Sequence, residues 1–308
     1  AVVDYFEAYT RKVVEALKDY VNLWITINEP NILFVLAYIQ GLFPPGKQSV
    51  ASAAKYALHA MRAHAAAYRA IHTNQPQARV GIALNYRSIK PALSWSPLDR
   101  WAARTSFRLF NDLFPQAIAK GVLNLLLTSQ KVPEAKGTQD FVGINYYTRT
   151  RAHFDLRAFR QAFLRESFPP NADLSDTGFL ANEPEGLFEA IQWGRQFNLP
   201  MIITENGVED ADDHLRPRYL VQHIHQMWRA VNFNIPIKGY FHWTLVDNFE
   251  WERGWTQRFG LWELNLETQA RRKRPSADLY AEICRQNALS YEMVATNAPE
   301  VLSKIFPD

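Results

Sequence analysis

Five short runs rich in β-branched and aromatic residues alternate along the chain with longer stretches in which apolar residues recur at a helical spacing. The short runs predict strands at 22–28, 79–85, 140–147, 200–206 and 237–245. The longer stretches predict helices near 50–72, 99–120, 184–197, 214–232 and 276–286. Strands that alternate with helices are typical of a parallel sheet whose faces are covered by helices. We therefore expect an α/β fold.

The first 20 residues form an amphipathic helical pattern. In AVVDYFEAYTRKVVEALKDY, one face of the predicted helix carries Val2, Val3, Phe6, Val13, Val14 and Leu17. The chain has no initiator Met and starts inside this pattern. We therefore expect that the beginning of the polypeptide is missing.

Polar and aromatic residues follow the predicted strands at their carboxyl ends. Asn28 and Glu29 end the first strand, and Glu205 lies at the same level of the fourth. In parallel α/β folds, and above all in TIM barrels, the carboxyl ends of strands carry the catalytic groups. If the sheet curls into a barrel, Glu29 and Glu205 would face one pocket. A pair of carboxylates across a cleft is the arrangement that hydrolyses glycosides.

Composition narrows the class of protein. The 308 residues are 47% hydrophobic and 21% charged, which fits one large globular domain with a sizeable core. The chain also has 9 Trp, 13 Tyr and 19 Phe, and aromatic rings at a strand-end rim suit the apolar faces of a sugar. A single cysteine, Cys284, excludes an intrachain disulfide and is compatible with a cytoplasmic location.

Charge and hydropathy argue against two kinds of partner. The net charge is only +3, and the basic residues are scattered apart from RRKR at 271–274, which we interpret as a solvated loop, so we expect no nucleic-acid partner. The acidic EDADD at 209–213 is also interpreted as a solvated loop, with the alternative that it shapes the entrance of the site. The apolar run at 32–39 is much shorter than the roughly 18 residues that a membrane span needs, so we expect no membrane partner.

The histidine pairs do not have the spacing of a helical metal site. His59 and His64 are five residues apart, and His223 and His225 are two apart, so neither pair shares the i, i+4 face. We interpret them as packing or surface residues and predict neither a metal nor a cofactor.

Four motifs resemble, in the same order, those of family-1 glycoside hydrolases, the β-glucosidase family. They are WITINEP at 24–30, DFVGINYYTR at 140–149, IITENG at 202–207 and HWTLVDNFEWERGWTQRFG at 242–260. The resemblance extends from the first residue to about Leu289 and leaves 290–308 as a C-terminal tail. It implies that 1–289 is a catalytic (β/α)8 barrel, a TIM barrel, that is incomplete at its N-terminal side and contains only strands four to eight.

The resemblance also implies roles for residues at the strand ends. Glu205 would be the nucleophile and Glu29 the general acid/base of a retaining β-glycosidase, with their carboxyls about 5 to 5.5 Å apart. Asn28 would hydrogen-bond the 2-hydroxyl of the sugar. Asn145 would not contact the sugar but would support the residues that do. Tyr147 would donate to Glu205 and keep it ionised.

The remaining implied residues lie after the last strand and would bind the sugar. Trp243 would form the floor of the subsite for the reacting sugar, Glu250 and Trp251 would reach the 4- and 6-hydroxyls, and Phe259 would line the wall beyond. A carboxylate at Glu250 would repel a 6-phosphate. The implied substrates are small, unphosphorylated β-glucosides or oligosaccharides, and β-galactosides or β-fucosides in addition.

Alternatives remain for both function and assembly. Another retaining TIM-barrel glycosidase would also carry glutamates after strands four and seven, although DNFEW at 247–251 argues against it. A catalytically impaired or inactive sugar-binding fragment is a further alternative, because the family's early strands supply a Gln and a His-Trp pair for the sugar. A partial barrel leaves two sheet edges unpaired, and either further N-terminal residues, which we favour, or a second copy of the chain as a homo-oligomer would cover them.

Overall fold

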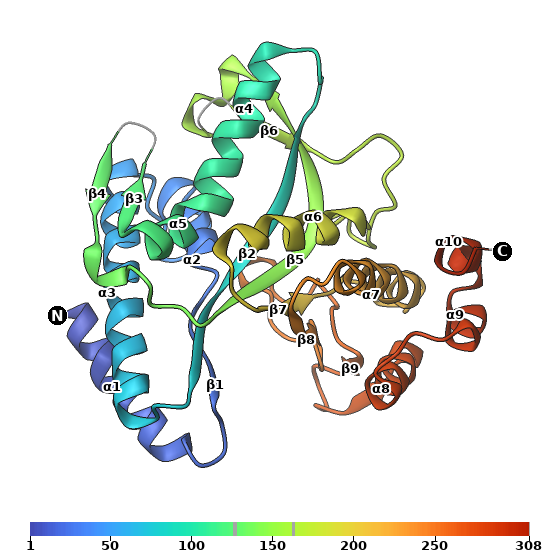
Figure 1. The fold of residues 1–308 in the computed structure, drawn as a ribbon. Coiled ribbons are helices and arrows are strands. Elements are labelled where there is room, and N and C mark those ends of the chain that lie inside the picture. Colours follow the sequence, from blue (N-terminus) through green and yellow to red (C-terminus); the bar gives the residue numbers. More distant parts are fainter. Residues whose placement is uncertain (126–127, 162–163, 308) are drawn as a thin grey trace. The chain divides into compact units, whose positions relative to one another are not determined.

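The computed structural model describes residues 1–125, 128–161 and 164–307, which form two compact units. The first unit comprises 1–145, 150–167 and 196–202, and the second comprises 146–149, 168–195 and the chain from 203 onward. In the main sheet the hydrogen-bonded order is β1 (Leu23–Asn28), β2 (Arg79–Pro91), β5 (Phe141–Phe154), β7 (Met201–Asn206) and β8 (Ile237–His242), and β6 (Leu164–Ser167) pairs with β5 (Figure 1). Residues of β5 and β7 belong to both units.

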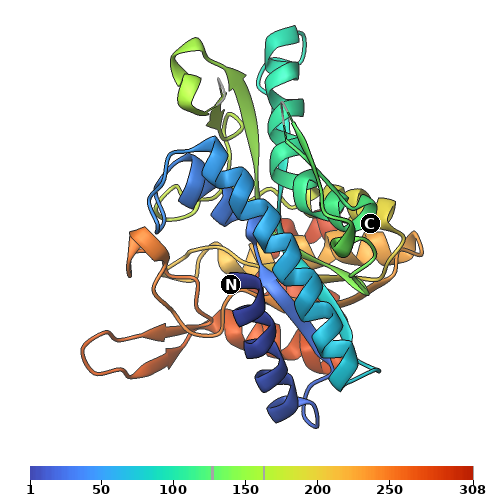
Figure 2. The same ribbon diagram turned by 90° about the vertical axis from the view of Figure 1, so that its left-hand side faces the viewer.

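In the first unit, α1 (Val2–Leu17) lies along α3 (Val50–Asn74), as Figures 1 and 2 both show. The buried face of α3 consists largely of alanine, which lets its neighbours approach closely. Val14, Ile71 and Val80 form a core cluster with Trp24 packed against it. The other elements of this unit are α2 (Pro30–Ile32), η1 (Leu33–Ile39), α4 (Pro97–Phe107), η2 (Arg108–Asp112), α5 (Leu113–Lys120), β3 (Val122–Asn124), β4 (Ser129–Lys131), η3 (Pro133–Ala135) and η4 (Leu156–Gln161).

The second unit packs α6 (Glu185–Gly194) against α7 (Arg216–Asn232). The short η5 (Arg195–Phe197) follows α6. After β8 come η6 (Trp251–Arg253), the hairpin of β9 (Trp262–Leu264) and β10 (Arg271–Lys273), and then α8 (Pro275–Gln286), α9 (Tyr291–Asn297), η7 (Pro299–Val301) and α10 (Leu302–Ile305).

The segment from 290 onward, predicted as a tail, is largely helical and packs into the second unit. Met293, Val294 and Val301 are buried in one cluster with Leu220 and Ile224 of α7. Each aliphatic side chain buried in this way stabilises the fold by on the order of 1.5–3 kcal/mol. The division at residue 289 into a barrel and a separate tail stays a prediction.

The predicted strands are present, but two are longer than expected and the last is shorter, since β8 ends at His242 rather than 245. β2 continues to Pro91 rather than 85, and β5 continues to Phe154 rather than 147. The extra length of β5 pairs antiparallel with β6 over Arg151–Phe154. Periodicity missed these extensions because basic and polar residues interrupt the apolar runs.

Two segments predicted as solvated loops are solvated only in part. Within 209–213, Glu209, Asp210 and Asp213 are buried, with 1%, 0% and 8% of their surface exposed. Within 271–274, residues Arg271–Lys273 form the exposed strand β10, whereas Arg274 is only 5% exposed. Charged side chains are rarely buried without partners, and these are tolerated because distant parts of the chain supply their hydrogen bonds and opposite charges.

No helix in the described ranges is both long enough and apolar enough to cross a membrane.

Candidate active site

Glu29 lies in a turn that its surroundings fix tightly. The residue has a left-handed backbone, with φ 48° and ψ 53°, directly before Pro30 begins α2. A non-glycine residue rarely adopts this conformation unless the structure around it enforces it. The Glu29 amide donates to the Ala83 carbonyl at 2.9 Å, and the fully buried Asn31 side chain donates to the Asn85 carbonyl at 2.7 Å. The turn therefore holds Glu29 at the carboxyl end of β1.

Two asparagine side chains from other strands bind the Glu29 carboxyl. Asn85 of β2 and Asn145 of β5 each donate a hydrogen bond to Glu29 Oε1 at 2.9 Å. Asn145 Nδ2 also lies 3.1 Å from Asn28 Oδ1, so it contacts both strand-end residues. All of these residues lie in the first unit.

Asn85 is not among the predicted site residues. In the sequence it is only the last residue of the second predicted strand. The signal that identifies it is its place beside β1, because Asn28 pairs with Ala83 in the sheet register and Asn85 lies two residues further along the same strand.

The surroundings of Glu29 favour its protonated form. Burial raises the pKa of this carboxyl above its ordinary value, and this effect outweighs three others that lower the pKa: the hydrogen bonds from Asn145 and Asn85 and the positive charge of Arg87. A carboxyl with a raised pKa keeps its proton to a higher pH. A general acid requires this property.

Glu205 lies on β7 in the second unit and is bound by Tyr147. The Tyr147 hydroxyl donates to Glu205 Oε2 at 2.5 Å. The carbonyl of Tyr147 accepts a hydrogen bond from the Tyr219 hydroxyl at 2.9 Å, and its ring packs edge-on against Phe259 with centroids 6.1 Å apart. Tyr147 is therefore held at both its backbone and its ring, with its hydroxyl bonded to Glu205.

The residues after Glu205 bring the end of β8 against β7. The Asn206 side chain donates to the Tyr146 carbonyl at 2.6 Å and accepts from the Tyr240 hydroxyl at 2.8 Å. The backbone amide of Trp243 donates to the Asn206 carbonyl at 3.0 Å. A Cβ atom on Gly207 would lie only 1.9 Å from the Trp243 carbonyl oxygen, so this position of the ENG motif requires glycine.

Glu250 and Trp251 lie on the loop after β8 in the second unit. The Glu250 amide donates to the Gly254 carbonyl at 2.7 Å, and Trp251 is 54% exposed. The Arg253 guanidinium lies over the Phe179 ring, 4.2 Å from its centroid. The predicted site residues are thus divided: the first unit holds Asn28, Glu29 and Asn145, and the second holds Tyr147, Glu205, Trp243, Glu250, Trp251 and Phe259.

The described side chains form no metal site. Within residues 1–125, 128–161 and 164–307, no group of three His, Cys, Asp or Glu side chains is arranged to hold a metal ion. His64 and His223 are fully buried, which agrees with their interpretation as packing residues.

Comparison with known proteins identifies the family. The family model of glycosyl hydrolase family 1 matches residues 1–289. The chain is 33% identical to a β-galactosidase of Pyrococcus woesei, over 92% of this chain and 62% of that protein. It is 29% identical to the cytosolic β-glucosidase of Homo sapiens, over 94% of this chain and 70% of the human protein. The chain therefore belongs to glycosyl hydrolase family 1.

Solved structures agree with this assignment. A β-glycosidase from Pyrococcus horikoshii superposes with a TM-score of 0.88 at 31% identity, over 96% of this chain and 68% of that one. A β-glucosidase from Thermotoga maritima in complex with glucoimidazole superposes with a TM-score of 0.85 at 29% identity, over 94% of this chain and 69% of that one. The fold is that of a partial (β/α)8 barrel, and the predicted fold class is confirmed.

The chain is shorter than these relatives. It spans about three fifths of the length of the curated β-galactosidases that it matches, with coverage of 60 to 62%.

Proposed function

We propose that this chain carries the catalytic residues of a retaining β-glycosidase that hydrolyses unphosphorylated β-glucosides by double displacement. The observation that carries the proposal is the contrast between two strand-end glutamates. Glu29 has a raised pKa and accepts from two neutral amides, whereas Glu205 accepts from the Tyr147 hydroxyl. One environment favours a carboxylic acid and the other a carboxylate, which is how two glutamates divide the roles of acid and nucleophile.

In the proposed reaction Glu205 attacks the anomeric carbon while Glu29 protonates the leaving oxygen. The glycosyl ester on Glu205 is then hydrolysed by a water that Glu29, now ionised, deprotonates. This sequence requires the two carboxyls to lie about 5 to 5.5 Å apart, which stays a prediction. Asn28 binds the 2-hydroxyl, where a hydrogen bond strengthens as positive charge develops in the transition state.

The substrate class rests on Glu250 and on the relatives. A carboxylate beside the 6-position repels a phosphate and accepts hydrogen bonds from free hydroxyls. The relatives are named β-galactosidases and β-glucosidases, which supports small β-linked glycosides as substrates. We extend the proposal to β-galactosides and β-fucosides.

A second candidate function concerns residues 1–308 taken by themselves, and it is binding of a sugar without turnover. In the family the early strands supply a Gln and a His-Trp pair for the 3- and 4-hydroxyls. A site without them would bind glucose weakly and accelerate hydrolysis little, because the contacts that hold the sugar in place also lower the barrier.

Turnover of aryl glucosides by the purified protein tests the proposal. We expect hydrolysis of p-nitrophenyl β-D-glucoside, a loss of about 10³-fold or more in Glu205→Gln, and residual hydrolysis of a dinitrophenyl β-D-glucoside in Glu29→Ala. Dinitrophenolate leaves without protonation, so the second variant should still form the glycosyl ester. Added azide should then replace water and yield a β-glycosyl azide, because two inversions restore the configuration.

The controls are an intact-mass measurement of each sample and Asn74→Ala, a change at the end of α3 that should leave turnover unaltered. An α-configured azide product from Glu29→Ala would overturn the assignment of Glu205 as nucleophile. Glucose binding without turnover by the parent protein would establish the second candidate function instead.

A further inference from the structure

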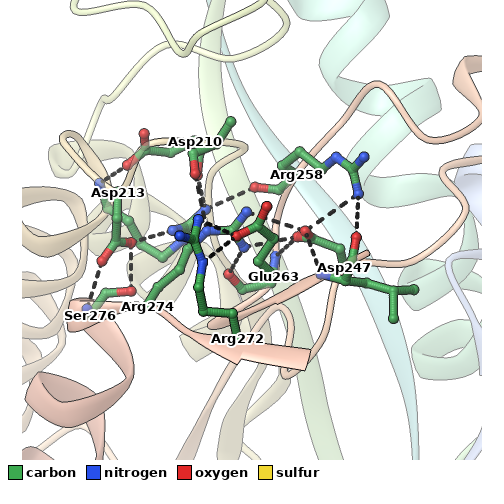
Figure 3. A network of polar contacts seen from close by, with 12 residues as sticks. Asp210, Asp213, Asp247, Arg258, Glu263, Arg272, Arg274 and Ser276 are labelled. Atoms are coloured by element: carbon green, nitrogen blue, oxygen red, sulfur yellow. Dashed lines mark hydrogen bonds and ion pairs between the residues drawn. The ribbon is translucent and has the colours of Figure 1, made fainter. Parts of the chain in front are cut away.

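Three buried aspartates and two buried arginines form a network in the second unit (Figure 3). The acids are Asp210, Asp213 and Asp247, which are 0%, 8% and 2% exposed. The bases are Arg216 and Arg274, which are 0% and 5% exposed. Charges this far from water are tolerated only when opposite charges and hydrogen bonds compensate them.

Asp247 closes the base of the loop 248–259, which carries Glu250 and Trp251. Its Oδ1 accepts from the Gly260 amide at 2.8 Å, and its own amide donates to the Trp262 carbonyl at 3.0 Å. The residues on either side of the loop are therefore joined through one aspartate.

Arg274, the residue directly before α8, binds both Asp247 and Gly260 at the base of the loop. Its two terminal nitrogens reach the two Asp247 oxygens at 3.0 and 3.2 Å, and Nη1 also donates to the Gly260 carbonyl at 2.6 Å. The backbone amide of Arg274 donates to the Leu261 carbonyl at 2.9 Å. A planar guanidinium makes this two-point contact with a carboxylate, and a lysine ammonium does not.

The same arginine joins the loop to the segment that follows Glu205. Arg274 Nε donates to the Ala211 carbonyl at 3.1 Å. The Asp210 amide donates to the Arg258 carbonyl at 3.0 Å, and the Arg216 side chain donates to that carbonyl at 2.8 Å.

Asp213 extends the network to α8. It pairs with Arg216, and it accepts from both the amide and the hydroxyl of Ser276 at 2.7 Å. The loop 248–259, the segment after β7 and the start of α8 are therefore held together by hydrogen-bonded charges.

A buried ion pair contributes little net stability, because desolvation offsets most of the attraction, but its hydrogen bonds constrain geometry. We propose that Asp247 and Arg274 are positioning residues that hold Glu250 and Trp251 where they reach the 6-position of the sugar. This inference rests on the proposed function, since it concerns the sugar-binding role of the loop.

Arg274→Lys tests the inference, because it keeps the charge and removes the two-point contact. We expect kcat/KM for p-nitrophenyl β-D-glucoside to fall about tenfold, mainly through KM, and that for p-nitrophenyl β-D-xyloside, which lacks the 6-carbon, to fall less than about threefold. The matched control is Arg272→Lys, since Arg272 is exposed and pairs with Glu263 on the hairpin. It should change neither value.

A general loss of structure would reduce kcat/KM for both sugars equally, so equal losses or no loss in Arg274→Lys would overturn the inference. Should that variant fail to fold, Arg258→Lys loosens the same carboxylate more mildly, since Arg258 Nη1 lies 3.5 Å from Asp247 Oδ2. Arg258→Lys should also lower kcat/KM more for the glucoside than for the xyloside, but by a smaller factor than Arg274→Lys.

Hydrogen exchange separates this inference from the proposed function. If the parent protein hydrolyses no aryl glycoside, the proposed function fails and the positioning role is judged by deuterium uptake alone. Faster uptake confined to 248–259 in Arg274→Lys, and absent in Arg272→Lys, would support the positioning role. Unchanged uptake in that loop would overturn it.

Discussion

At the scale of single residues, the amide groups around Glu29 determine where its proton lies. Asn85 and Asn145 both donate to Oε1, and an oxygen that accepts two N–H bonds is a poor place for a proton. In the proposed mechanism we therefore expect the proton that Glu29 transfers on Oε2. The two amides also oppose the effect of burial, because they stabilise the ionised form that burial disfavours.

The first prediction concerns the pH dependence of activity. It follows because burial raises the pKa of Glu29 whereas the asparagine hydrogen bonds lower it. Asn85→Ala removes a donor that lowers the pKa of Glu29, so the pKa should rise further above its ordinary value. In the proposed mechanism the acid form of Glu29 protonates the leaving group, so activity should be lost as the pH rises through its pKa. The basic limb of kcat/KM for p-nitrophenyl β-D-glucoside should therefore move to higher pH.

The measurement is a full pH profile of the parent, Asn85→Ala and the control Asn74→Ala, whose side chain bonds the Ala70 carbonyl within α3. The control should leave the profile unchanged. A basic limb that moves to lower pH in Asn85→Ala would contradict the role of Glu29 as the acid.

At the scale of elements, a buried histidine joins α3 to two other segments of the first unit. His64 is fully buried, and its Nδ1 lies 2.6 Å from the Thr26 hydroxyl of β1, while Nε2 lies 2.7 Å from the Thr138 carbonyl. A carbonyl only accepts, so Nε2 carries the hydrogen and the neutral ring accepts from Thr26. Burial lowers the pKa of His64 from 6.5 to about 4.

The second prediction concerns the contribution of His64 to the free energy of unfolding of the protein in acid. Between pH 6.5 and about 4 the unfolded chain binds a proton at His64 and the folded protein does not, so the free energy of unfolding falls as the pH falls. The loss from this group reaches roughly 3 kcal/mol at the acid end of the window. His64→Gln keeps a neutral, hydrogen-bonding side chain that does not titrate, so its stability should decline less over the same range.

Urea unfolding of both proteins at about pH 7, 5.5 and 4, which spans this window, gives the comparison. The difference between the two free energies, taken relative to neutral pH, isolates the contribution of His64, since the other titrating groups are shared. A parallel decline in the two proteins would show that folding does not lower the pKa of His64 and would refute the prediction.

At the scale of the whole chain, the two ends of the strand order are edges among the described residues. β1 pairs with β2 at one end, and β8 lies last in the order at the other. The β1 strand carries Leu23 and Ile25, which are 36% and 43% exposed, and Phe241 of β8 is 54% exposed. An edge strand with apolar side chains is a template for pairing with another chain.

The third prediction is that the polypeptide of residues 1–308 associates with itself in solution. Ile25→Lys places a charge on the β1 edge and should weaken the association by about tenfold or more, since a charged residue opposes strand pairing. Leu156→Lys is the control, because Leu156 is 72% exposed and belongs to neither edge strand. Sedimentation over a wide range of concentration measures both, and a parent that stays monomeric throughout would refute the prediction.

The sequence alone was sufficient to predict the family, the fold class and the alternation of strands and helices. These properties are local in the chain: the hydrophobic period reports on one element at a time, and each of the four motifs is a continuous run that includes part of one strand. The positions of Asn28, Glu29 and Glu205 at the ends of their strands follow from the same local pattern. Their roles in catalysis stay predictions.

Only the tertiary structure identified Asn85 as a partner of Glu29, because a hydrogen bond between residues 56 positions apart depends on the register of two strands. The burial of Asp213 and Arg274 also depended on it. Asp213 is buried because Ser276, 63 residues further along the chain, donates to it, and Arg274 is buried because it meets Asp247 from 27 residues away. Whether a charge lies in water or in the core is decided by such distant partners, and the local sequence does not specify them.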